Sequence, residues 1–110
     1  MSDERRKSQR FKVTVPVQLT LDTERFNGVL HDICRDAALV EVQRGVPLGS
    51  RLALALLLPG TGGPLMVVGQ VARLAPGEGA GQELAVLFTD VTTAAEARID
   101  FFVALQDQES

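Results

Sequence analysis

The regular alternation of hydrophobic and polar residues begins at Phe11. From there to Asp22, apolar and polar residues take turns along the chain. This period of two predicts a long β-strand with one buried face. Pro16 lies on the polar side and cannot donate a hydrogen bond to a neighbouring strand. It therefore predicts either an edge position or a bulge nearby.

Shorter apolar runs follow, separated by turns rich in glycine and proline. They predict five more strands, near residues 25–33, 38–43, 51–58, 65–74 and 83–89. Leu52, Leu54, Leu56 and Leu58 are expected on one face of the fourth strand.

The period changes at the end of the chain. Thr93, with Glu96 three residues later, resembles a capping box. A helix is therefore predicted from about Thr93 to Leu105, with a helical stripe formed by Ala95, Ile99, Phe102 and Leu105. Phe101 and Phe102 are adjacent and cannot both face the barrel centrally. One of them is expected to stay partly exposed and to support self-association or a partner contact; the alternative is that both rings pack against the barrel rim.

Six short strands and one terminal helix predict a mostly β fold. The expected architecture is a small six-stranded antiparallel β-barrel followed by a C-terminal α-helix. Residues 1–10 have no hydrophobic period and predict a flexible basic arm, whereas residues 11–110 form a single domain.

Composition narrows the functional classes. The chain has 110 residues and a net charge of −3, which disfavours a broad nucleic-acid interface. Its one cysteine, Cys34, excludes an internal disulfide and falls short of a structural zinc site. The polar N-terminus and the short apolar runs predict a cytoplasmic protein without membrane insertion.

The sequence shows no arrangement of residues that is typical of a catalytic site. His31 is the only histidine, and a strand would place its side chain opposite that of Asp32. No serine triad, metal cluster or phosphate-binding glycine loop can be assembled. We therefore expect neither an enzyme nor a metal site.

Two short segments carry the functional information: Arg5-Arg6-Lys7-Ser8-Gln9-Arg10 and Asp32-Ile33-Cys34-Arg35-Asp36-Ala37. Together they resemble the R-x-x-x-R and [D/N]-x-S-x-x-G motifs of PilZ domains, bacterial receptors for cyclic di-GMP. Residues 69–73 and 82–91 are similar to the last two strands of that family. The resemblance runs from Arg5 to about Phe102 and implies the same barrel followed by a helix.

The resemblance implies a ligand site. Arg6 and Arg10, with Arg5 as a helper, would clamp the phosphates and guanines of cyclic di-GMP, and Asp32 would accept hydrogen bonds from a guanine edge. Cys34 stands where serine is usual, and a thiol is a weaker donor. Ala37 stands where glycine is usual, so its methyl group obstructs the ligand or strains the turn. Together these departures would cost about 1.5–3.5 kcal/mol of binding.

Three functions remain open from the sequence. The first is a cyclic di-GMP receptor that signals through an unidentified protein partner, because the chain holds no output domain. The second is a degenerate PilZ domain that binds no nucleotide and acts as an adaptor in motility or pilus control. The third, a barrel that binds single-stranded nucleic acid, is disfavoured by the acidic balance and the scarcity of aromatic residues.

Overall fold

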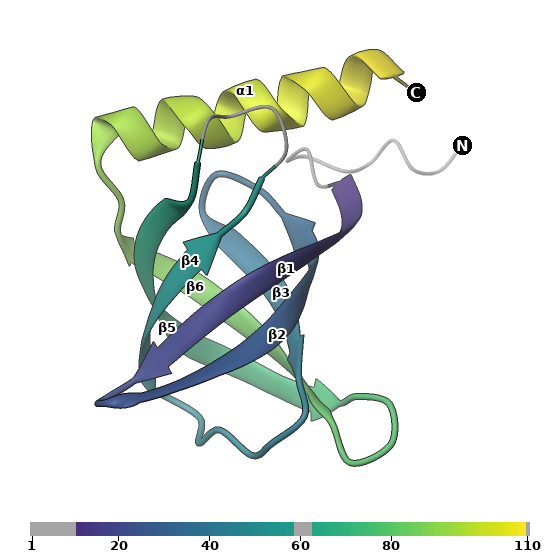
Figure 1. Cartoon of the computed structure of the whole chain (residues 1–110), viewed down its shortest axis with the longest axis vertical. Coiled ribbons are helices and arrows are strands. Elements are labelled where there is room, and N and C mark those ends of the chain that lie inside the picture. The colour runs from purple at the N-terminus through teal and green to yellow at the C-terminus, as the bar shows by residue number, and fades with distance from the viewer. Residues whose placement is uncertain (1–10, 59–62, 110) are drawn as a thin grey trace.

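The computed structural model describes residues 11–58 and 63–109. Six antiparallel strands close into a barrel, and one helix lies across an end of it (Figure 1). The elements are β1 (Phe11–Leu21), β2 (Glu24–Ile33), β3 (Ala37–Val42), β4 (Arg51–Leu56), β5 (Leu65–Pro76), β6 (Gln82–Asp90) and α1 (Thr93–Glu109). The fold class predicted from the sequence is confirmed. The predicted arm, residues 1–10, lies outside the described residues.

Closure of the barrel depends on two pairings between strands that are not consecutive in the chain. The strands run in the order β1-β2-β3-β6-β5-β4, and β4 pairs back onto β1. The last strand, β6, lies between β3 and β5. Along the residues where β4 pairs with β1, Val17 to Thr20, the closed barrel has no free sheet edge that could pair with another chain.

Alternating side chains fill the interior. In β1, Val15, Val17 and Leu19 are buried, whereas Pro16 and Gln18 are exposed. The alternate leucines predicted from 52 to 58 are all buried. Burial of these side chains is the main stabilising term, because each removes apolar surface from water.

Pro16 lies at a position in β1 that suits a residue without a backbone N–H. It pairs with Val29 of β2, but the pairing of β1 with β4 begins only at Val17. A register irregularity also lies just before it, between Lys12 and Val15. Both the edge position and the bulge predicted from the sequence are therefore present.

The helix is longer than predicted and begins differently. It continues to Glu109, beyond the expected end at Leu105. The cap is Thr92 rather than Thr93, because the Thr92 hydroxyl accepts a hydrogen bond of 3.0 Å from the Ala95 amide. The adjacent threonines offer the same chemistry, and only the backbone geometry selects between them.

The helix closes one end of the barrel with its apolar face. Ala95, Ile99 and Phe102 are buried in the core, while Phe101 is 53% exposed. The prediction that one of the two phenylalanines stays exposed is thus confirmed, and the alternative that both are buried is wrong. On another face, the Arg98 guanidinium donates to the carbonyl oxygens of Gly63 and Pro64 and ties the helix to the segment before β5.

We predict that Gly69→Ala destabilises the barrel. A Cβ atom at Gly69 would lie 2.6 Å from the carbonyl oxygen of Leu87, so the β5–β6 pair would have to separate. Overpacking of this kind costs about 1–3 kcal/mol. The free energy of unfolding should fall by that amount in denaturant titrations.

Gly45→Ala is the matched control. A Cβ at Gly45 meets nothing within 4 Å, and its φ is not in the left-handed region. Its unfolding free energy should stay within about 0.5 kcal/mol of the wild type. Equal losses in the two variants would contradict the close approach of β5 and β6.

Candidate functional site

The turn between β2 and β3 is held rigidly by the backbone. The Cys34 amide donates to the Ala37 carbonyl at 2.9 Å and closes the turn. The Phe88 amide of β6 donates to the Asp36 carbonyl at 2.8 Å. The turn is therefore fixed both within itself and to the neighbouring strand.

A side chain also connects this turn to the helix. The Arg35 guanidinium donates to both carboxylate oxygens of Asp100, at 2.6 and 3.3 Å. These hydrogen bonds, followed by the negative charges of Asp100 and Glu96, raise the pKa of Arg35. Both partners are about half exposed, so the pair orients the turn and the helix more than it stabilises the fold.

Asp32, Cys34 and Ala37 come together beside this turn. They line a small depression of about 150 Å³ on the outer surface of the barrel. Asp32 is 95% buried (5% exposed), whereas Cys34 and Ala37 are half-buried. The other lining residues are Ile33, Ala38, Leu39, Arg73 and Ala85.

The backbone at Ala37 removes one of the two penalties expected there. Asp22 (φ 58°) is the only residue other than glycine with positive φ in the described part of the chain. Ala37 is instead the first residue of β3 and pairs with Leu87. The expectation of a strained turn is therefore wrong, and only the methyl group remains as an obstacle to a ligand.

A bulge in β2 places His31 and Asp32 on the same face. Leu30 pairs with Val40 and Asp32 with Leu39, so His31 is an extra residue. Leu30 and Ile33 both face the core, and the two residues between them face outward. The expectation that His31 and Asp32 point to opposite faces is wrong, because it assumed an uninterrupted strand.

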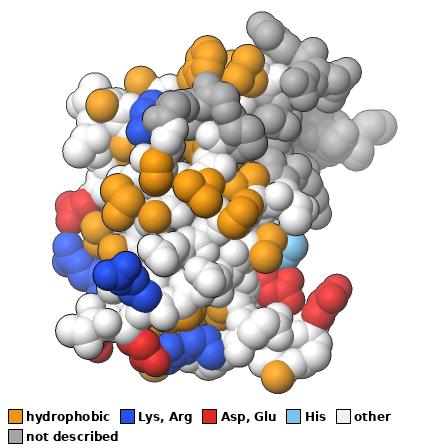
Figure 2. Space-filling view, viewed as in Figure 1, with side chains coloured by type: hydrophobic (Ala, Val, Ile, Leu, Met, Phe, Trp, Pro, Cys, Tyr) orange, Lys and Arg blue, Asp and Glu red, His pale blue; other side chains and the backbone are white. Residues whose placement is uncertain are grey.

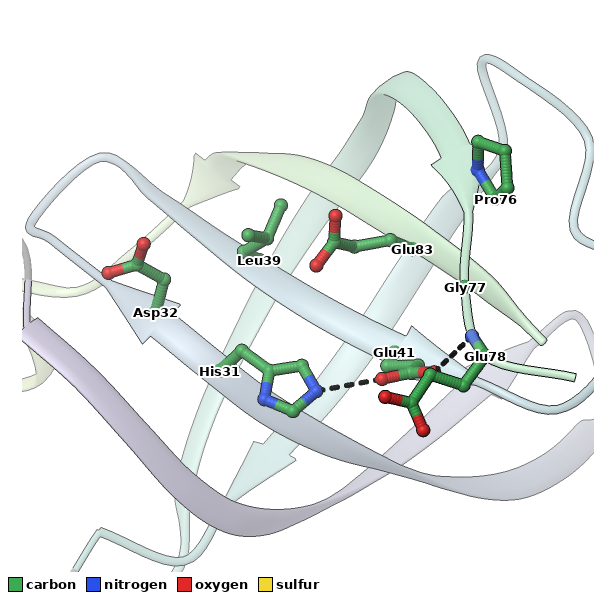
Figure 3. A pocket seen from close by; sticks show the side chains of 8 residues that line it. All are labelled: His31, Asp32, Leu39, Glu41, Pro76, Gly77, Glu78 and Glu83. Carbon is green, nitrogen blue, oxygen red and sulfur yellow. Dashed lines mark hydrogen bonds and ion pairs between the residues drawn. The ribbon is translucent and has the colours of Figure 1, made fainter.

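A larger and acidic depression adjoins the first. It has a volume of about 430 Å³ and shares Asp32 and Leu39 with the smaller one (Figure 3). Glu83 projects from β6 toward its centre. Glu41 of β3 accepts one hydrogen bond of 2.9 Å from the Glu78 amide and pairs at 2.9 Å with the His31 ring. These contacts, that of Glu78 first, lower the pKa of Glu41.

Arg73 is a site residue that the sequence analysis did not select. In β5, Val71 pairs with Val86 and Arg73 with Ala85, so Ala72 is an extra residue and both Ala72 and Arg73 are exposed. This second bulge brings a guanidinium to the edge of the smaller depression. The sequence contained the arginine, but neither the bulge nor the proximity of β5 to the β2–β3 turn.

Three further predictions from the sequence concern the N-terminal arginines, a metal site and membrane insertion. Arg5, Arg6 and Arg10 lie outside the described residues. Within residues 11–58 and 63–109, no group of three or more His, Cys, Asp or Glu side chains is arranged to hold a metal ion. No helix in the same part of the chain is long and apolar enough to cross a membrane.

The match to a known family covers nearly the whole chain. The PilZ domain model matches residues 4–105. The chain belongs to the PilZ domain family. No curated protein matches the sequence.

Several solved PilZ structures share the fold at low sequence identity. The PilZ domain of Escherichia coli YcgR, solved with c-di-GMP, is 16% identical with a TM-score of 0.75, and 96% of this chain covers 93% of it. Bacillus subtilis MotI, an inhibitor of motility, is 16% identical with a TM-score of 0.76, and 96% of this chain covers 53% of it. K. pneumonia MrkH, in its c-di-GMP complex, is 14% identical with a TM-score of 0.77, at 96% and 52% coverage. This chain thus spans about half the length of MotI and of MrkH.

We predict that the stabilising contribution of Glu41 depends on pH. Its pKa in the folded protein is below the ordinary value of 4.5, so its carboxylate stabilises the fold above that value. The contribution disappears as pH falls through the lowered pKa. Glu41→Gln should therefore reduce the unfolding free energy more at about pH 7 than at about pH 3.

Urea titrations of the wild type and the variant at the two pH values provide the measurement. Glu24→Gln is the control, because Glu24 is largely exposed and pairs only with the Arg44 guanidinium among the ion pairs described. A Glu41→Gln effect that is the same at both pH values would contradict the prediction.

Proposed function

We propose that this PilZ domain is a receptor for cyclic di-GMP that passes the signal to a protein partner. The observation that carries the proposal is the convergence of Asp32, Cys34, Ala37 and Arg73 on one depression beside a rigid turn. A carboxylate and a guanidinium on one outer face suit a ligand with both guanine edges and phosphates. The c-di-GMP complexes of YcgR and MrkH support the same ligand class.

The charges of the two depressions suggest an orientation for the ligand. Asp32, Glu41, Glu78 and Glu83 line the larger one, and their carboxylates would repel a phosphate. The phosphates therefore belong on the Arg73 side. Asp32, at the junction of the two depressions, would accept hydrogen bonds from the N1 and N2 donors of a guanine.

The N-terminal arginines complete the proposed site. Arg73 is one cation, whereas cyclic di-GMP carries two phosphates. Arg6 and Arg10, with Arg5 as a helper, would supply the others from the chain segment before β1. Guanidinium groups grip phosphates through paired hydrogen bonds and also stack on guanine faces.

The helix is the proposed route to the partner. A ligand at the β2–β3 turn would contact the segment whose Arg35 pairs with Asp100 of α1. The neighbouring Phe101 is 53% exposed and offers an apolar contact for a protein. We infer that the domain acts in the cytoplasm without catalysing a reaction.

A second candidate is a PilZ adaptor that binds no nucleotide, acting for instance in motility or pilus control. Two observations favour it: the substitutions at Cys34 and Ala37, and the carboxylates that flank the site. Titration calorimetry with cyclic di-GMP, GTP and a short oligonucleotide separates the candidates. Heat only with cyclic di-GMP supports the receptor, and no heat with any of the three supports the adaptor.

We predict that Arg6→Ala, Arg10→Ala and Arg73→Ala each weaken cyclic di-GMP binding by about 1.5–3 kcal/mol, the range for a charge-assisted hydrogen bond. Added salt should weaken wild-type binding as well, because it screens phosphate contacts. Arg51→Ala is the control, since Arg51 pairs with Asp90 outside both depressions. A uniform loss across all four variants would show that net charge, rather than this site, governs binding.

We also predict the effect of restoring the family motif with Cys34→Ser and Ala37→Gly. Without backbone strain at Ala37, the double variant gains one hydroxyl hydrogen bond and loses the methyl group that obstructs the ligand. The double variant should bind about 0.5–1.5 kcal/mol more tightly, or roughly two- to tenfold. Calorimetry on both proteins measures the difference, and weaker binding by the double variant would contradict the assigned roles.

A further inference from the structure

Two neighbouring cross-strand rows on the outer face of the barrel carry no charged side chain. On β1, β4 and β5 these rows are Gln18–Ala55–Met66 and Thr20–Ala53–Val68, and the charged Arg51 of β4 lies in the next row, beside Thr20–Ala53–Val68. We call these six residues the uncharged strip. Figure 2 shows hydrophobic side chains gathered across the middle of this face, with charged side chains toward its margins.

A hollow and a projection lie at one end of the strip. The hollow is a groove of about 270 Å³, lined by Gln18 and Ala55 of the strip and by Pro16, Val17, Asn27, Leu57 and Pro64 next to it. None of its lining residues is charged. Beside it project Leu57, 48% exposed, and Met66, 61% exposed. Large exposed apolar side chains next to an apolar groove are typical of a protein contact.

We propose that the uncharged strip is a self-association face that binds a second copy of this chain around a two-fold axis. In such a dimer each copy presents the same patch, so a projection and a hollow within one patch can fill each other. Met66 or Leu57 of one protomer would enter the groove over Ala55 of its partner.

Charge favours a second copy as the occupant. The chain carries a net charge of −3, and its acidic depression presents several carboxylates on another face. Two copies that met through that face would bring like charges together, which costs binding energy. The uncharged strip lets two copies meet without this repulsion and leaves the depressions beside the β2–β3 turn open. The inference is therefore independent of the proposed ligand.

The size of the strip indicates a weak dimer. Three strands about 4.8 Å apart and a few residues long give a contact about 15 Å across, or roughly 200 Å². This is smaller than the roughly 800 Å² that each partner buries in a standard interface. Association should consequently depend on concentration and be visible by sedimentation equilibrium up to about 1 mM, where a millimolar dissociation constant is measurable.

The test compares charge insertions in the strip or its adjoining groove with a charge insertion elsewhere. Leu57→Glu and Met66→Glu each place like charges in both halves of the interface, and each should raise the dimer dissociation constant at least about tenfold. Leu48→Glu is the control, because Leu48 is 63% exposed in the segment between β3 and β4, away from the strip. Circular dichroism melting verifies that each variant is folded, and Met66→Gln replaces Met66→Glu if the charge prevents folding.

A mixture of two variants provides the decisive measurement. Leu57→Glu and Leu57→Lys should each be monomeric alone and should associate when mixed, because opposite charges then face each other across the axis. A wild type that stays monomeric throughout the concentration range would overturn the proposal. So would a loss of association in Leu48→Glu equal to that in Leu57→Glu, or a mixture that remains monomeric.

Discussion

Closure of the sheet is the constraint on which the rest of this structure depends. A closed barrel has a single interior, and every strand must keep returning apolar side chains to it. A strand that gains one residue would turn its following side chains outward unless the backbone absorbs the addition. In β2 and β5 a bulge does so, and the core pattern resumes at Ile33 and Leu74. Core packing is preserved, and an additional side chain faces the solvent at each bulge.

Those additional positions form much of the candidate site. The bulge in β2 gives His31 and Asp32 a common face, and the bulge in β5 gives Ala72 and Arg73 a common face. The two strands are not neighbours, since β3 and β6 lie between them. Asp32 and Arg73 nevertheless line one depression, whose lining includes Leu39 of β3 and Ala85 of β6 between them. The chemistry of the depressions is thus a product of barrel geometry as much as of the β2–β3 motif.

The sequence alone predicted the strands and the helix well, but it predicted poorly which strands pair and where the bulges lie. Alternation identified the first and fourth strands, because burial on one face produces a period of two, and apolar runs bounded by turn residues identified the other four. The spacing of Ile99 and Phe102 identified the helix. Strand order and bulges were not predictable, because they depend on contacts between residues distant in the chain. For the same reason Asp32, Cys34 and Ala37 were found through a local motif, whereas Arg73 and Glu41 were missed. Thr92 rather than Thr93 caps the helix because of the backbone geometry. The sequence could not predict this, because the two adjacent threonines have the same side chain.

The position of β6 has a consequence for how the chain reaches its folded state on the ribosome. The segment up to β5 can form hairpins and can pair β4 with β1, but β3 and β5 meet no common neighbour until residues 82–90 arrive between them. The interior would also lack Ile99 and Phe102 until the helix emerges. Vectorial synthesis therefore cannot complete this domain stepwise from its N-terminus. Barrel closure is a late, cooperative event, and nascent chains stalled before residue 82 would expose β3 and β5 as unpaired edges to chaperones.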